Sequence, residues 1–193
     1  YRHALENYTH LATLAPSMYE DKVIGIQMCL AWLYDMMEDY PKAEAMWKSC
    51  IQSLEPHKND SIETYDNQLA ICYIAVAELY GKLQRIDESE NWYKQGMKAY
   101  QYLAERFHSG YDAEVARTMI LLAHLYSDNK SYAEGETMYK SALDIYKSLA
   151  KSNSSNYASK VAKTQYYLSL LYWVTDRYAD CAALCHACIN SYI

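Results

Sequence analysis

Apolar residues recur along the chain at intervals of three and four positions, and short polar stretches interrupt these runs. In the stretch 111–126 one set of apolar positions is spaced by four, three, one and three residues; it is Val115, Met119, Leu122, Ala123 and Tyr126. Such spacing places them on one face of a helix, because a helix completes a turn every 3.6 residues. A polar link at 127–131 follows, and a second run with the same spacing begins at Tyr132. The pattern predicts two helices joined by a short turn.

The same pattern returns every 46 residues without a gap. One column of the repeat is Tyr34, Tyr80, Tyr126 and Tyr172. Another is Tyr19, Tyr65, Tyr111 and Tyr157, and a third is Leu33, Leu79, Leu125 and Leu171. A fixed period of this length indicates a helical-repeat architecture, in which each unit buries its apolar face against its neighbours.

We therefore expect an all-α fold built from antiparallel helix pairs, with nine helices and no strands. The whole chain, 1–193, is predicted to be one repeat array. A partial repeat is expected at 1–15, and the full repeats are expected at about 19–60, 65–107, 111–153 and 157–193. Pro41 suits the first turn of a helix, where its missing N–H costs no hydrogen bond.

The residues that close the first helix of each repeat resemble a known family. The segments "AELY" (77–80) and "AHLY" (123–126) are followed by "RIDES" (85–89) and "SYAEG" (131–135), each with an aromatic residue four positions later. This pattern resembles the tetratricopeptide repeat, in its elongated form found in kinesin light chains and bacterial arrays. The resemblance covers essentially the whole chain. It implies a right-handed α-α superhelix whose inner surface, made by the first helices, binds peptides or proteins.

Composition and charge exclude several classes of protein. The net charge is −6 and no run of Lys or Arg occurs, so nucleic-acid binding is not expected. No apolar run is long enough to cross a membrane. The chain has no glycine-rich phosphate loop, no His-Glu-x-x-His motif and no nucleophile elbow. We therefore expect neither an enzyme nor a cofactor.

The cysteines have the pattern of structural side chains. Cys29, Cys50 and Cys72 lie singly in apolar runs, which favours buried thiols and a cytoplasmic location. Near the carboxyl end, Cys181, Cys185, His186 and Cys188 fall within eight positions. However, the columns of Cys181 and Cys188 hold small residues in the other repeats, namely Ala43, Ser89, Gly135, Gly96 and Ala142. His186 points about 100° away from Cys185 on a helix, so four convergent zinc ligands are absent and no metal site is expected.

A second face of each first helix varies from repeat to repeat and yet carries large apolar side chains. Columns that pack must stay alike, whereas a variable column faces outward and is free to bind. We predict that this face forms one partner-binding groove. Its expected residues are Met28, Trp32, Ile74, Glu78, Arg117, Ile120, His124, Lys163, Tyr166 and Leu170. His124 is expected to line the groove or pack there, and a catalytic role is the less favoured interpretation.

Two classes of function remain open from the sequence. The first is a non-catalytic interaction module that binds a peptide or a partner helix in the groove. The second is a structural spacer or sensor segment that transmits conformational change to an effector domain and has no ligand of its own. Tyr1 aligns with Trp47 and Ile193 with Glu55, so both ends are expected to fall inside a longer array, and exposed repeat ends are expected to self-associate.

Overall fold

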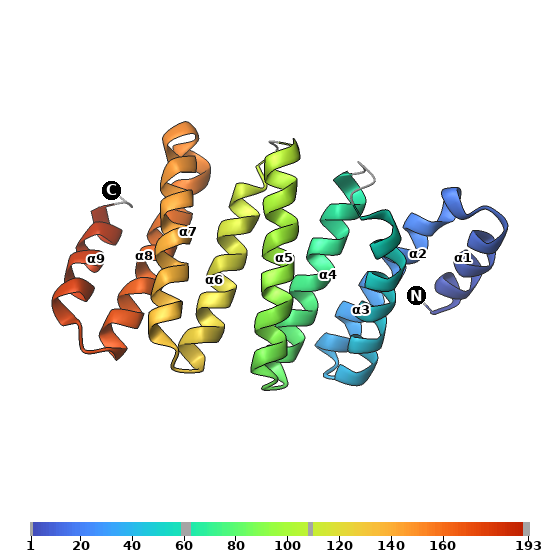
Figure 1. The fold of residues 1–193 in the computed structure, drawn as a ribbon, viewed down its shortest axis with the longest axis horizontal. Helices are drawn as coiled ribbons and strands as arrows, with labels where there is room; N and C mark the ends of the chain where they lie inside the picture. The colour runs from blue at the N-terminus through green and yellow to red at the C-terminus, as the bar shows by residue number, and fades with distance from the viewer. Residues whose placement is uncertain (1, 59–62, 108–109, 191–193) are drawn as a thin grey trace. The chain divides into compact units, whose positions relative to one another are not determined.

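The computed structural model describes residues 2–58, 63–107 and 110–190, and within these ranges the regular structure is helical throughout. The helices are α1 (Arg2–Leu14), α2 (Pro16–Met36), α3 (Tyr40–Leu54), α4 (Glu63–Lys82), α5 (Ile86–Phe107), α6 (Asp112–Asp128), α7 (Tyr132–Ser152), α8 (Ser154–Val174) and α9 (Tyr178–Asn190). A single 3₁₀ turn, η1 (Glu55–His57), follows α3. Figure 1 shows consecutive helices running antiparallel, as the repeat pattern predicts. The all-α fold and the nine helices are thus confirmed for the described part of the chain.

The chain forms two compact units, Tyr1–Ala99 and Tyr100–Ile193, and α5 runs through the boundary between them. In the first unit the core lies where α2, α3 and α4 meet, around Trp47, Tyr73 and Tyr80. In the second unit α6, α7 and α8 meet around Tyr139 and Tyr146. Tyrosine rings therefore occupy the interior positions, and the hydroxyls of Tyr80, Tyr139 and Tyr146 form hydrogen bonds.

Small residues occur where the two helices of a pair touch. Ala43 and Ser89 have no exposed surface, and the Ser89 hydroxyl donates a 2.7 Å hydrogen bond to the Ala77 carbonyl oxygen. At Gly135 a Cβ atom would stand 3.0 Å from the Ser127 hydroxyl. Close helix contact thus explains why the column of Cys181 holds only small side chains.

The links within the helix pairs share one backbone conformation. At each, one residue adopts a left-handed φ between 58° and 62°; these residues are Glu38, Gln84, Lys130 and Asp176, which lie 46 apart. In the link at Lys130, the Ser131 N–H donates to the Tyr126 carbonyl at 2.8 Å and the Lys130 N–H to that of Ser127 at 3.0 Å. This is a Schellman C-cap, a position that glycine normally fills.

Replacing Lys130 by glycine is expected to stabilise the protein by about 1 kcal/mol, because an L-residue pays that much to adopt the left-handed conformation. For a chain of this length the melting temperature should rise by roughly 2–4 °C. Thermal unfolding followed by circular dichroism measures the shift. Lys130→Ala keeps the strain and serves as the control. A glycine variant that melts no higher than the alanine variant would contradict the prediction.

One link differs from the sequence-based expectation. The expected repeat bounds, 111–153 and 157–193, leave residues 154–156 between two repeats, but α7 continues to Ser152 and α8 begins at Ser154. Only Asn153 separates them. Its side chain accepts a 3.4 Å hydrogen bond from the Asn156 N–H, which caps α8. A good N-cap residue therefore lets the second helix start three residues earlier than the repeat pattern indicates.

Candidate functional site

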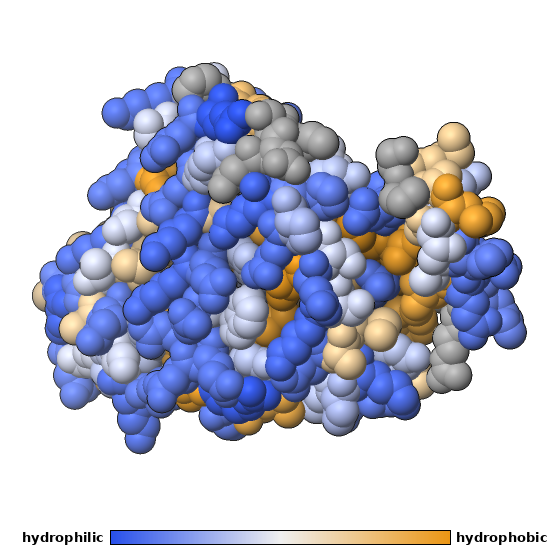
Figure 2. All heavy atoms as spheres, turned by 45° about the vertical axis from the view of Figure 1, so that its right-hand side comes forward, coloured by the Kyte–Doolittle hydropathy of each residue, from blue (hydrophilic) through white to orange (hydrophobic). Residues whose placement is uncertain are grey.

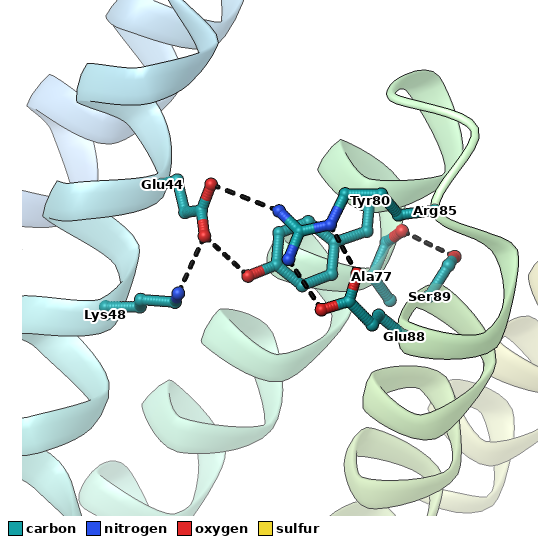
Figure 3. A network of polar contacts seen from close by, with 7 residues as sticks. All are labelled: Glu44, Lys48, Ala77, Tyr80, Arg85, Glu88 and Ser89. Carbon is teal, nitrogen blue, oxygen red and sulfur yellow. Dashed lines mark hydrogen bonds and ion pairs between the residues drawn. The ribbon is translucent and has the colours of Figure 1, made fainter.

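A polar network joins consecutive repeats within the first unit (Figure 3). The Glu44 carboxylate on α3 accepts hydrogen bonds of 2.7 Å from the Tyr80 hydroxyl on α4 and 2.7 Å from Lys48. Arg85, in the link after α4, lies 3.4 Å from the same carboxylate and also pairs with Glu88. Its guanidinium stacks 3.8 Å from the centre of the Tyr80 ring. We call this arrangement, an acid of one repeat bound to the tyrosine and arginine of the next, the repeat-joining network.

The network recurs 92 residues later in the second unit, twice the repeat length. Glu136 on α7 accepts from the Tyr172 hydroxyl at 2.8 Å and pairs with Lys140 and Arg177, each at 2.7 Å. Arg177 stacks 4.0 Å from the Tyr172 ring centre. The repeat pattern places this tyrosine column on the apolar face of the helix. The structure shows that its hydroxyls also bind an acid on the preceding helix. The acid of one repeat therefore binds the tyrosine and the arginine of the next, so the network links consecutive repeats.

The ten residues predicted for the groove do not all reach the surface. In the first unit, Met28 and Ile74 are only 6% and 3% exposed, so both contribute to packing. Ile74 is buried because α5 carries Gly96 opposite it, where a Cβ atom would lie 2.4 Å from the Ile74 Cδ1. Trp32 is 45% exposed, and its ring is nearly perpendicular to that of Trp47. Glu78 is also exposed.

In the second unit the predicted residues surround two neighbouring hollows between α6 and α8. The first hollow has a volume of about 310 Å³, and its lining includes His124, Asp128, Tyr139, Tyr167 and Leu170. The second has a volume of about 230 Å³, and its lining includes Arg117, Ile120, His124, Lys160, Lys163 and Tyr167. His124 and Tyr167 line both, so the hollows adjoin. Tyr166 lies beside them with 51% of its surface exposed.

The wall between the two hollows is a set of aromatic rings. Tyr139 and His124 share a 2.7 Å hydrogen bond between the hydroxyl and Nδ1, and the His124 ring meets the Tyr167 ring edge-on with centroids 4.5 Å apart. Burial has the largest effect on the pKa of His124 and lowers it. The Asp128 carboxylate raises this pKa, whereas the charge of Lys163 lowers it further. Burial also raises the pKa of Tyr139 to about 12. Both shifts favour the uncharged form, so the hydrogen bond joins a neutral imidazole and a neutral phenol.

The second hollow is locally positive although the chain as a whole is negative. Arg117, Lys160 and Lys163 line it, and its lining includes no acidic side chain. Arg117 is paired with Glu114 at 2.9 Å. Lys163 lies 5.7 Å from the Tyr167 ring centre. Sequence reasoning missed Tyr139, Lys160 and Tyr167 as lining residues. Tyr139 belongs to a column that the repeat pattern assigns to packing. Lys160 and Tyr167 lie outside the variable face of α8 from which the groove residues were predicted.

The cysteines are all free thiols, and the prediction that they are buried is wrong for Cys29 and Cys185, which are exposed. Cys50 and Cys72 are buried as expected, but Cys29 is exposed because it lies across α2 from the buried Ile24 and Ala31. The Cys188 thiol contacts the Ala162 carbonyl oxygen at 3.3 Å. Cys50 points at the equivalent carbonyl of Ile24, at 4.0 Å. Among the residues that the structure describes, no three His, Cys, Asp or Glu side chains are placed to hold a metal ion.

Repeated helix pairs, small residues at their contacts and a surface formed by the first helices of the pairs define a helical-repeat fold. The tetratricopeptide repeat family model matches residues 115–155. This match confirms, over that segment, the resemblance seen in the sequence. Of the described helices, none combines the length and apolar character that crossing a bilayer requires.

Solved structures of similar fold extend this likeness along the chain. BtubC (BKLC) from P. vanneervenii is 18% identical, with a TM-score of 0.73 over 98% of this chain and 70% of that one. RapI in its apo form is 13% identical, with a TM-score of 0.73 over 97% of this chain. Aspartyl phosphate phosphatase F from Bacillus subtilis is 12% identical, with a TM-score of 0.69 over 88% of this chain.

These structures show the fold and leave the function open. The chain spans 47% of RapI and 40% of the phosphatase. The search of curated proteins found no match.

Proposed function

We propose that the chain is a non-catalytic interaction module that binds an extended segment of a partner protein on the α6–α8 surface. The observation that carries this proposal is the pair of adjoining hollows in the second unit, which five of the residues predicted from the sequence line. Each hollow has room for one side chain, and Tyr166 and Leu170 add exposed apolar area beside them. Clustered aromatic and apolar side chains of this kind are typical of the residues that dominate protein binding.

The charges suggest how such a segment would lie. An apolar or aromatic side chain fits the first hollow, where His124, Tyr167 and Leu170 meet. An acidic side chain fits the second, where Lys160 and Lys163 form no ion pair with a described residue. Electrostatic complementarity would then fix the direction of the segment and favour acidic partners over basic ones.

Selection of random peptides on the intact chain tests this proposal. Selected peptides should bind Tyr166→Ala or Leu170→Ala at least about tenfold more weakly than the unaltered protein, which is the loss expected for an interface anchor. Cys29→Ala changes an exposed residue of the other unit and should bind as the unaltered chain does. Peptides that bind all variants equally would place the surface elsewhere.

The same selection separates this function from its alternative. A spacer or sensor segment without a ligand predicts that no peptide is enriched. It also predicts no rise in melting temperature when peptides are added. A ligand bound at 100 times its Kd would stabilise the fold by about 2.7 kcal/mol, which thermal unfolding detects easily.

A further inference from the structure

The second of the two hollows between α6 and α8 concentrates positive charge in an acidic chain. The sequence holds 24 Asp and Glu residues against 18 Lys and Arg residues, and hydrophilic side chains cover most of the face in Figure 2. The charged side chains that line this hollow are nevertheless all basic, namely Arg117, Lys160 and Lys163. A concave site whose charge is opposite to that of the chain attracts anions.

The two lysines of the hollow lie three positions apart on α8, which places both on one side of the helix. Each is exposed, and neither forms an ion pair with another residue in the described part of the chain. The Lys163 ammonium group instead lies 5.7 Å from the Tyr167 ring centre. Like charges at this spacing repel each other, so a bound anion would relieve an unfavourable interaction that the free chain retains.

The equivalent positions of α6 show what α8 lacks. They hold Glu114 and Arg117, which pair at 2.9 Å. The residues 46 positions later are Lys160 and Lys163, so Lys160 stands where the preceding repeat has the acid that neutralises its own basic residue. Glu114 offsets one of the three cations around the hollow, and two positive charges remain in excess.

The uncharged part of the lining favours an aromatic side chain in the hollow. Ile120, Leu121 and Tyr167 contribute apolar and aromatic surface to a volume of about 230 Å³. A short acidic side chain such as aspartate would leave part of this surface uncovered, whereas a phenyl ring would contact it.

A phosphate group matches the excess charge better than a carboxylate does. A carboxylate carries a single negative charge, whereas a phosphate monoester carries a charge of about −1.5 to −2 at neutral pH and offers three strong acceptor oxygens. Hydrogen bonds from lysine ammonium groups to phosphate are charge-assisted and therefore strong. An aromatic ring that carries a phosphate group thus fits both parts of the lining.

We propose that the second hollow binds a phosphorylated tyrosine of the partner segment, with the phosphate held by Lys160 and Lys163. This inference rests on the proposed function, because the same segment places an apolar side chain in the first hollow. Arg117 keeps its pair with Glu114 and adds to the positive charge of the site. The module then distinguishes the phosphorylated partner from the unphosphorylated one.

Two synthetic peptide libraries test the proposal on the intact chain. They are alike except that the central residue is tyrosine in one and phosphotyrosine in the other, and the flanking positions are random. Peptides selected from the phosphotyrosine library should bind at least about tenfold more tightly than the same peptides without the phosphate, the gain expected for hydrogen bonds to a charged group. Isothermal titration calorimetry measures both dissociation constants. Phosphoserine at the same position should bind more weakly than phosphotyrosine, because it lacks the ring.

The double variant Lys160→Ala, Lys163→Ala should remove the preference for phosphate and leave the binding of unphosphorylated peptides unchanged. Both lysines are exposed, so the variant should keep its helix content by circular dichroism. Lys22→Ala is the matched control, because Lys22 holds the position of Lys160 in α2 and its side chain is 61% exposed. This control should bind both kinds of peptide as the unaltered chain does.

Failure of this inference and failure of the proposed function give different results. Phosphorylated and unphosphorylated peptides that bind equally, with both weakened by Tyr166→Ala, would overturn the phosphate site and keep the proposed function. A preference for phosphate that survives in the double variant would also overturn the site, and so would equal binding of phosphoserine peptides. If neither library yields a peptide that binds, both proposals are wrong.

Discussion

Replacing Trp47 by alanine is expected to lower the free energy of unfolding by about 3–5 kcal/mol, the usual cost of removing a large buried aromatic side chain. Trp47 is 1% exposed and lies in the core of the first unit, among residues that include Ile24, Cys50 and Tyr73. Neighbouring helices relax only partly into the space left behind, so most of the lost contact area is not recovered. Denaturant unfolding followed by circular dichroism measures the change.

Trp32 provides the matched control for this prediction. The two indole rings meet edge to face with centroids 5.2 Å apart, but Trp32 is 45% exposed. Trp32→Ala should therefore cost only about 1 kcal/mol, mainly the aromatic contact itself. If both variants lose the same free energy of unfolding, the surface and core faces of α2 and α3 are assigned incorrectly.

Replacing Glu136 by alanine is expected to cost about 2–3 kcal/mol, because it leaves Tyr172 and Arg177 without their shared acceptor. The Glu136 side chain is 19% exposed, so water compensates only part of this loss. Tyr172→Phe removes one hydrogen bond from the same network and should cost about 1 kcal/mol. If the alanine variant is as stable as the unaltered chain, the network does not hold the repeats together.

The same carboxylate should make stability depend on acid pH. Burial alone would raise the pKa of Glu136, but hydrogen bonds from Lys140, Tyr172 and Arg177 outweigh it and lower the pKa to about 2. The folded pKa is below the value of about 4.3 for an unfolded chain, so the stabilisation is complete above that value. It is lost as the pH falls from about 4 towards 2. Urea unfolding at several pH values should show this loss in the unaltered chain and a smaller loss in Glu136→Ala.

The period of 46 residues was enough to predict the helices, because equivalent positions of each repeat pack against equivalent neighbouring helices and therefore hold similar residues. The contact of helix pairs explains the small column of Ala43, Ser89 and Gly135. The period could not show which variable residues are buried, since that depends on the neighbouring helix. Ile74 is buried because Gly96 leaves room for it, and nothing within α4 itself indicates this.

The candidate site was predictable only in part for the same reason. Comparing columns identified Arg117, Ile120, His124, Lys163 and Leu170, which line the two hollows. It did not identify Tyr167, which lines both hollows and follows the predicted residue Tyr166 in α8. Likewise, the acid at Glu44 recurs visibly, but its partner Tyr80 is 36 residues away. Pairings between repeats require the three-dimensional arrangement.

The single-residue link at Asn153 limits how the length of this repeat can change. Only one residue separates α7 from α8, and Glu136 on α7 forms a hydrogen bond with Tyr172 on α8. One extra residue within α8 before Tyr172 would turn every later side chain by about 100° and carry the tyrosine hydroxyl away from its acceptor. An insertion of three or four residues returns the tyrosine to the same side of α8 but shifts it by about one helical turn along the axis. Because one turn is about 5.4 Å along the helix axis, even that insertion would separate the two groups, so the pairing of Glu136 with Tyr172 requires the present length of this segment.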